Sequence, residues 1–250
     1  MSAKTLDQAA LDRALAKGAL ARVEVGRGCR VAGGDRVVTC EDVVFHATVF
    51  RDASLSGARF SQCTFLGCLF RSADLADAVF ESCRFYDPDE EIACDFSYAN
   101  LRRARFERAD LTTSKFTRVR AFGIEVVNCQ ATGADFSDAD FALGHGDFSQ
   151  ASFDSCNLAY ADFSRTGLDE CALTGCRLHH AVFHDASLRG ADLSGSALEN
   201  IEGRGLVLAG ADLRGATFNN LDPRVVDLTG VRIDPEQGLE LLRAIGIEVG

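Results

Sequence analysis

Large apolar residues recur along this chain at every fifth position. Phe or Leu occupies that position from Phe45 to Phe85, resumes at Phe96, and resumes again at Phe148 on the way to Phe218. Of the 18 phenylalanines, only Phe122 lies outside this register. A period of five fits neither the ~3.6 residues of a helical turn nor the alternation of a strand, so the chain must turn a corner once per repeat. The pattern predicts an all-β solenoid.

The residue two positions before each large one is small, most often Ala or Cys. Eight of the ten cysteines take this position: Cys63, Cys68, Cys83, Cys94, Cys129, Cys156, Cys171 and Cys176. We therefore expect buried thiols that act as compact hydrophobic groups, and no metal site. Where the large residue shrinks to Gly203, the neighbouring small positions grow to Ile201 and Leu206, which keeps the core volume roughly constant.

Charge and composition narrow the choice of partner. The formal net charge of the 250 residues is -11, which argues against direct nucleic acid binding because phosphate contacts need a basic surface. No apolar run reaches the ~18 to 20 residues of a membrane span, and the N-terminal stretch is too charged for a signal peptide. We expect a cytoplasmic protein with no membrane association.

The sequence offers little catalytic chemistry. It contains no CxxC pair, no acidic or Cys ligand at metal-ligand spacing on a helix beside the histidines, and no recognisable pairing of a nucleophile with a base. The adjacent His179 and His180 fall at a predicted turn, where a solvated pair is expected. We predict a protein that is not an enzyme and that takes no cofactor and no metal.

Repeats such as Ala73-Asp74-Leu75, Ala109-Asp110-Leu111 and Ala191-Asp192-Leu193 resemble the pentapeptide-repeat family. The segments beginning at Phe85 (FYDPDEEIACDFSYANLRRARF), Phe122 and Leu221 are similar to the Qnr-type quinolone-resistance proteins within it. The resemblance implies a right-handed quadrilateral β-helix with four repeats per coil. We expect this β-helix to carry short capping helices at the termini. It also implies a protein that binds DNA gyrase and topoisomerase IV and protects them from fluoroquinolones.

Two interruptions of the register predict loops near 86–93 and 142–147. The first falls between Phe85 and Phe96, and the second between Phe141 and Phe148. The resemblance implies that both loops project and contact the topoisomerase, although a tolerated insertion in an exposed turn is the alternative. The candidate partner-binding residues are Tyr86, Asp87, Pro88, Asp89, Glu90, Glu91, Ile92, Leu143, Gly144, His145 and Gly146.

The two ends carry helical patterns. Asp234 and Pro235 begin a helix with the apolar positions Leu239, Leu242, Ile245 and Ile247, which the resemblance implies to be a homodimer interface. A helix that only caps its own core is the alternative. At the other end, Thr5 to Gln8 resembles a capping box, which predicts a helix to about Lys17. We therefore divide the chain into an N-terminal helix and cap (1–40), the repeats (41–233) and a C-terminal dimerisation segment (234–250).

Acidic residues concentrate between Asp135 and Glu170. From this segment we predict an acidic face formed by Asp138, Asp154, Asp169 and Glu170. A rod of about nine coils would be ~43 Å long, and DNA of that length carries ~25 charges, so any mimicry of DNA must be partial. Topoisomerase protection is the favoured function. The alternatives are an interaction scaffold for another protein, an immunity protein against a gyrase-directed toxin, and, least favoured, an enzyme.

Overall fold

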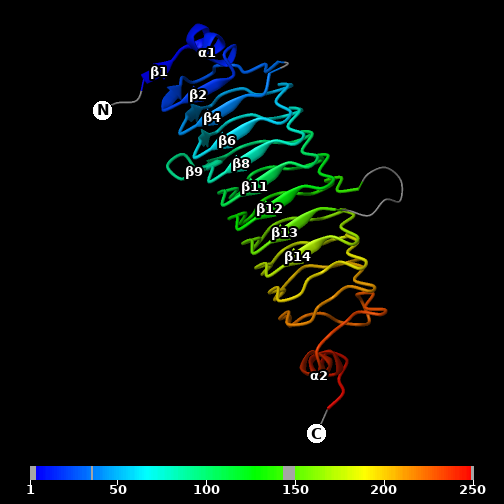
Figure 1. Cartoon of the computed structure of the whole chain (residues 1–250). Helices are drawn as coiled ribbons and strands as arrows, with labels where there is room; N and C mark the ends of the chain where they lie inside the picture. Colours follow the sequence, from blue (N-terminus) through cyan, green and yellow to red (C-terminus); the bar gives the residue numbers. More distant parts are fainter. Residues whose placement is uncertain (1–3, 35, 143–149, 249–250) are drawn as a thin grey trace.

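The chain winds into a β-helix of about eight turns, seen from the side in Figure 1. The structure is a computed structural model that describes residues 4–34, 36–142 and 150–248. Each coil pairs in parallel with the next. In the uninterrupted coils, Phe45 lies opposite Phe65 and Phe60 lies opposite Phe80. Four columns of such pairs run along the rod and give it four faces, A to D. The predicted all-β solenoid is confirmed.

Two of the faces contain regular strands. Face A comprises β1 (Lys4–Leu6), β3 (Val23–Val25), β5 (Val44–His46) and β7 (Thr64–Leu66). Face D comprises β2 (Ala19–Ala21), β4 (Thr39–Glu41), β6 (Arg59–Ser61), β8 (Val79–Glu81), β11 (Arg105–Glu107), β12 (Glu125–Val127), β13 (Ser152–Asp154) and β14 (Ala172–Thr174). On faces B and C, each coil pairs with the next through a single bridge. The first of these bridges join Arg30 to Val49 on face B and Gly33 to Ser54 on face C.

Phenylalanine rings stack along the inside of the rod. The ring centroids of Phe45 and Phe65 are 4.9 Å apart, and the rings are nearly parallel. The same stacking joins Phe50 to Phe70 at 4.4 Å and Phe70 to Phe96 at 4.6 Å. Each ring therefore buries its area against the coils on both sides.

The small positions are buried as the pattern predicts. All ten cysteines are free and buried, and burial raises the pKa of the Cys40 and Cys171 thiols. Within the described ranges, no three His, Cys, Asp or Glu side chains gather closely enough to hold a metal ion. At Gly203, an added Cβ would lie only 2.9 Å from Leu206 Cδ2, so Leu206 fills the volume that the glycine leaves.

The corners depend on acidic side chains that belong to the repeat motif. The residue before the large one is often Asp, and its carboxylate accepts a hydrogen bond from the backbone N–H two residues later. Asp95 accepts from Ser97 at 2.9 Å, and Asp162 accepts from Ser164 at 2.8 Å. This Asx-type contact stabilises each tight turn. The motif aspartates thus hold the corners in shape.

Both interruptions insert residues without changing the order of faces. Phe85 stacks on Phe65 on face A, and Phe96 stacks on Phe70 on face B, so Phe85 and Phe96 lie on consecutive faces. The first interruption is therefore one repeat of five residues plus six inserted residues.

The second interruption corrects the register of the third run. Phe153 pairs with Val126 on face D and follows Phe141 on face C, so it is the next core position after Phe141. Phe148, at which the sequence pattern starts this run, lies outside the described residues, and within the described residues the run starts at Phe153. Twelve residues cover the single step from Phe141 to Phe153, so seven are inserted there.

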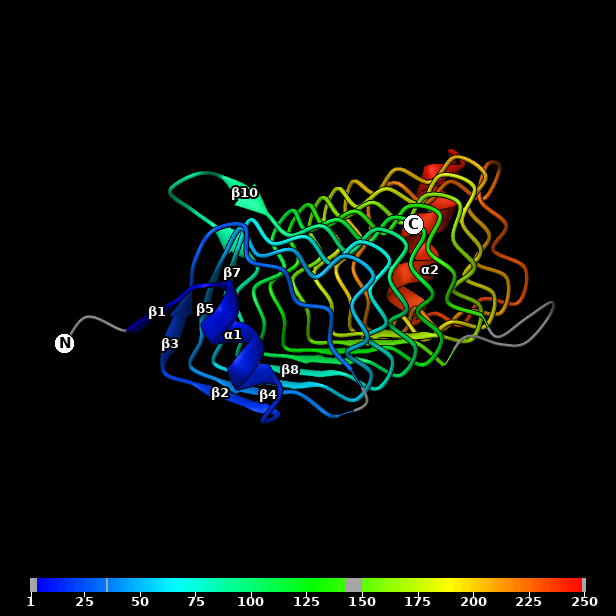
Figure 2. The ribbon, with the colours of Figure 1, turned by 90° about the horizontal axis from the view of Figure 1, so that it is seen from above.

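A helix closes the N-terminal end. α1 (Gln8–Leu15) takes the place of faces B and C between β1 and β2, and Figure 2 shows it lying across the open first coil. Its Leu11 is fully buried. The predicted start at Thr5 is wrong, because Thr5 lies in β1 opposite Glu24, and Asp7 is the N-cap that accepts from Ala10 N at 2.8 Å.

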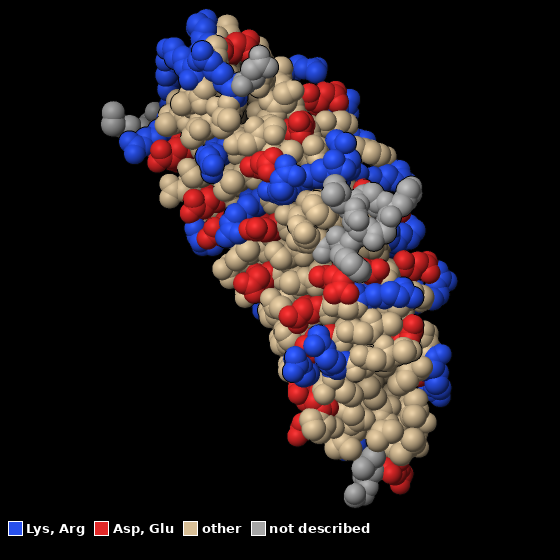
Figure 3. Space-filling view, turned by 45° about the vertical axis from the view of Figure 1, so that its right-hand side comes forward, with Lys and Arg blue, Asp and Glu red and all other residues tan. Residues whose placement is uncertain are grey.

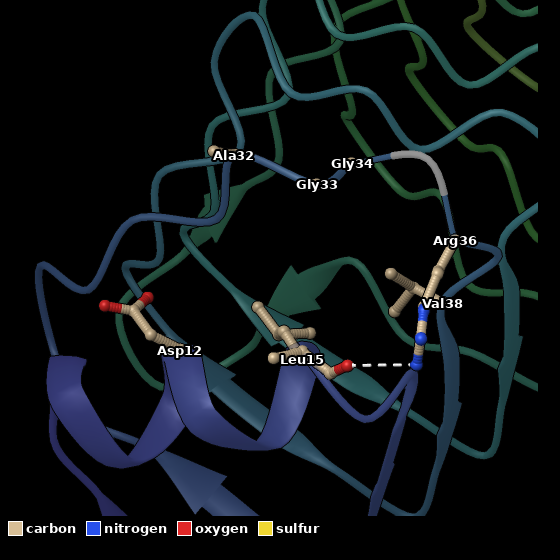
Figure 4. Close-up of a pocket in the computed structure, with 8 residues that line it drawn as sticks. Asp12, Leu15, Ala32, Gly33, Gly34, Arg36 and Val38 are labelled. Carbon is tan, nitrogen blue, oxygen red and sulfur yellow. Dashed lines mark hydrogen bonds between the residues drawn. The ribbon is translucent and has the colours of Figure 1, made fainter.

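A shallow pocket of about 260 Å³ remains between α1 and the first coil (Figure 4). It is lined by Asp12, Leu15, Ala16, Ala32, Gly33, Gly34, Arg36 and Val38. Arg36 reaches across it and donates to the carbonyl of Ala16 at the end of α1, at 3.4 Å. The pocket is thus partly closed by a contact that also satisfies the helix C-terminus.

α2 (Pro235–Ala244) closes the C-terminal end of the rod in a different way. Its Gln237 is buried and donates to the carbonyls of Leu213 and Ala216, each at 2.6 Å. Neither α1 nor α2 has the length or the apolar run that a membrane crossing needs.

Candidate functional site

The first interruption forms a hairpin that leaves the corner between faces A and B. β9 (Tyr86–Asp87) pairs antiparallel with β10 (Ile92–Ala93), and Figure 2 shows this hairpin outside the outline of the coils. The Asp87 carboxylate accepts from the backbone N–H groups of Asp89 and Glu90, at 3.0 and 3.3 Å. We call residues Tyr86–Ala93 loop 1.

Loop 1 presents most of its predicted binding residues to solvent. Pro88, Asp89, Glu90 and Glu91 are exposed, and Ile92 is 45% exposed. Tyr86 and Asp87 are half-buried at the base of the hairpin. An apolar side chain next to three exposed acids gives this loop the mixed chemistry of an interaction surface.

The second predicted loop cannot be compared in the same way. Leu143, Gly144, His145 and Gly146 lie outside the described residues. The described chain on either side, at Ala142 and Gln150, places the insertion on the corner between faces C and D.

The four residues of the predicted acidic face lie in three places. Asp138 occupies the corner between faces B and C, and Asp154 ends β13 on face D. Asp169 and Glu170 share the corner between faces C and D. The structure therefore brings Asp169 and Glu170 together and holds Asp138 apart from Asp154.

Their charges are also unequal. Asp138 lies between two arginines, with Arg165 Nε at 2.7 Å and Arg118 Nε at 3.7 Å. The hydrogen bond from Arg165 holds the pKa of Asp138 below its usual range. Asp154 accepts from Thr174 Oγ1 at 3.0 Å, and Glu170 is exposed. Asp154 and Glu170 thus present more uncompensated charge than Asp138.

Several other acids of this segment serve the corners. Asp135 and Asp140 accept from the backbone N–H groups of Ser137 and Ala142, at 2.9 and 3.1 Å. On the surface seen in Figure 3, acidic and basic groups interleave and do not form one continuous acidic stripe. The high acidic content of the segment is therefore partly a requirement of the repeat.

A row of polar side chains on the B–C corner was not predicted. It runs from Arg71 over the ring of Tyr98 to Arg118, Asp138 and Arg165 in successive coils. Arg118 donates to the Tyr98 hydroxyl at 3.0 Å, and Arg71 lies 5.9 Å from the Tyr98 ring centroid. The signal was present in the sequence, because these residues all fall two positions after a large residue of face B, except Arg71, which falls one position after.

The predicted apolar residues of the C-terminal end lie on α2 and just after it: Leu239 and Leu242 belong to the helix, Ile245 is its C-cap residue, and Ile247 follows. Leu239, Leu242, Ile245 and Ile247 have exposed fractions of 37 to 45%. Leu241 packs against the core. We call these four exposed apolar residues at the end of the rod the α2 strip.

Comparison with known families places most of the repeat region in one group. Models described as pentapeptide repeats match residues 40–87 and 92–121, and one described as a pentapeptide repeat region matches residues 146–228. The first gap between these matches falls within loop 1.

Two curated proteins are similar to the chain. It is 41% identical over 121 residues to the pentapeptide repeat protein QnrB4 of Escherichia coli, a match that covers 47% of this chain and 56% of QnrB4. It is 34% identical over 136 residues to the quinolone resistance pentapeptide repeat protein QnrB96 of Scandinavium goeteborgense, over 53% of this chain and 54% of that protein. The chain therefore spans about half the length of these curated relatives.

A solved structure matches over a greater length. The full-length structure of QnrB1, described as a plasmid-mediated fluoroquinolone resistance protein, superposes with a TM-score of 0.77 at 34% identity. The match covers 82% of this chain and 97% of the QnrB1 chain. The coil architecture is thus shared along nearly all of QnrB1.

Proposed function

Because this chain belongs to the pentapeptide-repeat family and to its Qnr-type quinolone-resistance proteins, we propose that it protects DNA gyrase and topoisomerase IV from fluoroquinolones. Protection would come from binding the enzyme rather than the drug, with no catalytic step. The observation that carries the proposal is the match to QnrB1 over 97% of that protein.

Loop 1 is the part of the site that supplies specific contacts in this proposal. It presents an exposed Ile92 beside Glu90 and Glu91 on a hairpin whose turn is fixed by Asp87. A preformed loop loses little conformational freedom when it binds, which favours affinity. Pro88 further restricts the backbone of the turn.

The net charge has a separate role. A protein of charge -11 is attracted to the basic DNA-binding surface of a topoisomerase, which speeds encounter more than it strengthens the final complex. Of the four predicted acids, Asp154 and Glu170 contribute most to this attraction, since Asp138 is compensated by Arg165 and Arg118. Resemblance to DNA is therefore partial.

The protein is proposed to act as a homodimer through the α2 strip. Four apolar side chains gather at the end of a rod whose other apolar positions are mostly inside. A two-fold contact would bring each strip against its copy and bury both. Each dimer would then carry two copies of loop 1, one on each half of a longer rod.

A gyrase supercoiling assay with ciprofloxacin tests the proposal. The intact protein is expected to restore supercoiling as its concentration rises. No restoration at any concentration would contradict the proposal and favour a scaffold for another partner. Restoration against a gyrase-directed peptide toxin alone would instead favour the immunity function.

The structure supplies a matched variant for loop 1. Deleting Asp87–Ile92 leaves Phe85, Tyr86, Ala93, Cys94, Asp95 and Phe96, which is one uninterrupted repeat. Ala93 then takes the corner position that Ala47 has two coils earlier. The variant is expected to keep its fold, by circular dichroism and thermal unfolding, and to lose protection. Full protection by the folded variant would remove loop 1 from the mechanism.

A further inference from the structure

The tip of loop 1 is in contact with the first coil of the solenoid. Arg27 Nη2 lies 2.6 Å from Glu90 Oε1, although the two residues are 63 positions apart in the sequence. Arg27 belongs to the tight turn after β3, in which Gly26 N donates to the carbonyl of Leu6 at 3.0 Å. The contact thus joins loop 1 to the N-terminal end of the rod.

The corner between faces A and B provides the path for this contact. Arg27, Ala47, Gly67 and Asp87 occupy the same corner in four successive coils, as the pairing of Val25 with Phe45 and Phe45 with Phe65 shows. The two intermediate residues are small. An added Cβ on Gly67 would lie 3.3 Å from Ile92 Cγ2, so Ile92 passes directly over this glycine. Loop 1 therefore reaches back along the rod.

The charges of loop 1 favour its contact with Arg27. Loop 1 carries Asp87, Asp89, Glu90 and Glu91 within five residues, so its acids repel one another. The hydrogen bond and the charge of Glu90, with a smaller contribution from Asp87, raise the pKa of Arg27. Arg27 thus offsets the repulsion at the tip.

We propose that Arg27 is a positioning residue, which holds loop 1 against the first coil so that its exposed acids and Ile92 meet the partner protein in one orientation. This role rests on the proposed function. The side chains of Arg27 and Glu90 are 70% and 47% exposed, and such a pair adds little to global stability. It acts instead on the loop, whose local opening is far easier than unfolding of the coils. A pair of this kind shifts the loop population about two- to fivefold.

The position of loop 1 can be measured directly. Single cysteines introduced at Asp89 on the loop and Thr39 on β4 accept spin labels, while the ten native thiols are buried. In the otherwise unchanged chain we expect one narrow distance distribution. R27E should broaden it, R27K should largely keep it, and R27E combined with E90R should narrow it again. R30E changes an exposed arginine of the same coil and should have no effect.

Protection is measured in parallel with the unlabelled proteins. R27E should raise the concentration needed for half-maximal restoration of supercoiling about two- to fivefold, with R27K and R30E close to the unchanged chain. Thermal unfolding should be the same for all three.

The outcomes separate the two proposals. An unchanged distance distribution in R27E would show that Arg27 does not hold the loop. A broadened distribution with undiminished protection would remove the positioning role. If the unchanged chain gives no protection, the proposed function fails and the positioning role fails with it, whereas the distances still decide whether Arg27 holds loop 1.

Discussion

A helix that begins after an aspartate closes each end of the rod, yet the two helices bury different kinds of side chain and leave different surfaces exposed. α1 buries Leu11 completely and takes the place of faces B and C between β1 and β2. α2 buries the polar Gln237 against open carbonyls and leaves the α2 strip exposed. Because an open β-helix end exposes unpaired backbone, both ends need a cap, but only one cap leaves apolar area uncovered.

This difference indicates that the two ends have different tasks. The N-terminal end is finished within one chain, and it also reaches loop 1 through Arg27. At the C-terminal end Gln237 satisfies two backbone carbonyls and the α2 strip stays exposed, and we propose that a second copy covers it. Four changes, taken from the largest expected effect to the smallest, test that contrast.

The largest effect is expected at the α2 strip. L242E together with I245E should weaken the homodimer roughly a thousandfold, ~4 kcal/mol, because symmetry places each charge twice in an apolar contact. Sedimentation velocity should then show monomers whose coils unfold as before. V225E alters an exposed apolar residue outside α2 and should leave the dimer intact. A wild-type protein that is already monomeric at micromolar concentration would contradict the dimer.

At the other end, L11A should cost about 2 to 5 kcal/mol, since it opens a cavity beneath α1. Unfolding of this variant should begin in the first coils, because the stability of a repeat protein depends on contacts between neighbouring repeats. Hydrogen exchange of the strands β2 and β4 checks this. L15A, at a half-buried position of the same helix, should cost less. Equal costs would show that α1 does not close the core through Leu11.

The buried polar contact of α2 predicts an intermediate effect. Q237L keeps the volume but removes both donors, so the carbonyls of Leu213 and Ala216 lose their partners at a cost of about 1 to 3 kcal/mol. Urea unfolding measures it. E240Q, an exposed change in the same helix, is the control. A neutral Q237L would mean that water replaces the amide.

The smallest effect depends on pH. Arg214, and less strongly Arg232, lower the pKa of the buried Asp212 to about 2. Because the pKa is lower in the folded state, the stabilisation is complete above about pH 4 and is lost as the pH falls through about 2. D212N should therefore cost about 1 to 2 kcal/mol at pH 7, a value reduced because both arginines are exposed. The free energies of unfolding of D212N and the unchanged chain should therefore converge as the pH falls to about 2. A difference that persists below about pH 2 would contradict this prediction.

The sequence was sufficient to predict the coil, and it was not sufficient to predict contacts between corners that are far apart in the chain. The five-residue period places Phe70, Phe163 and Leu193 inside because a repeated unit has the same environment in every coil. The interruptions broke that reasoning: Phe148 shares the spacing of a core position, yet Phe153 is the next one. Only pairing between coils shows how many residues an insertion adds.

The same limit applies to the site. Loop 1 could be located from the gap between Phe85 and Phe96, but its contact with Arg27 depends on the direction in which the hairpin leans. The acids near Asp135 were assigned by charge alone, whereas the structure uses Asp135 and Asp162 to hold corners. A one-dimensional pattern distinguishes inside from outside, and it does not distinguish a free carboxylate from one that is occupied.

Every uninterrupted coil has the same number of residues and the same spacing to its neighbour, so the length of the rod changes in equal steps. Residues 168–187 form one complete circuit, and its removal would join Gly167 to Leu188 with every column still aligned. The separation between loop 1 and the α2 strip would then shrink by one strand spacing, ~4.8 Å. Duplication of such a unit would lengthen it by the same step. Loss or gain of whole coils can therefore change the span between loop 1 and the α2 strip in fixed steps while the packing of the core is kept.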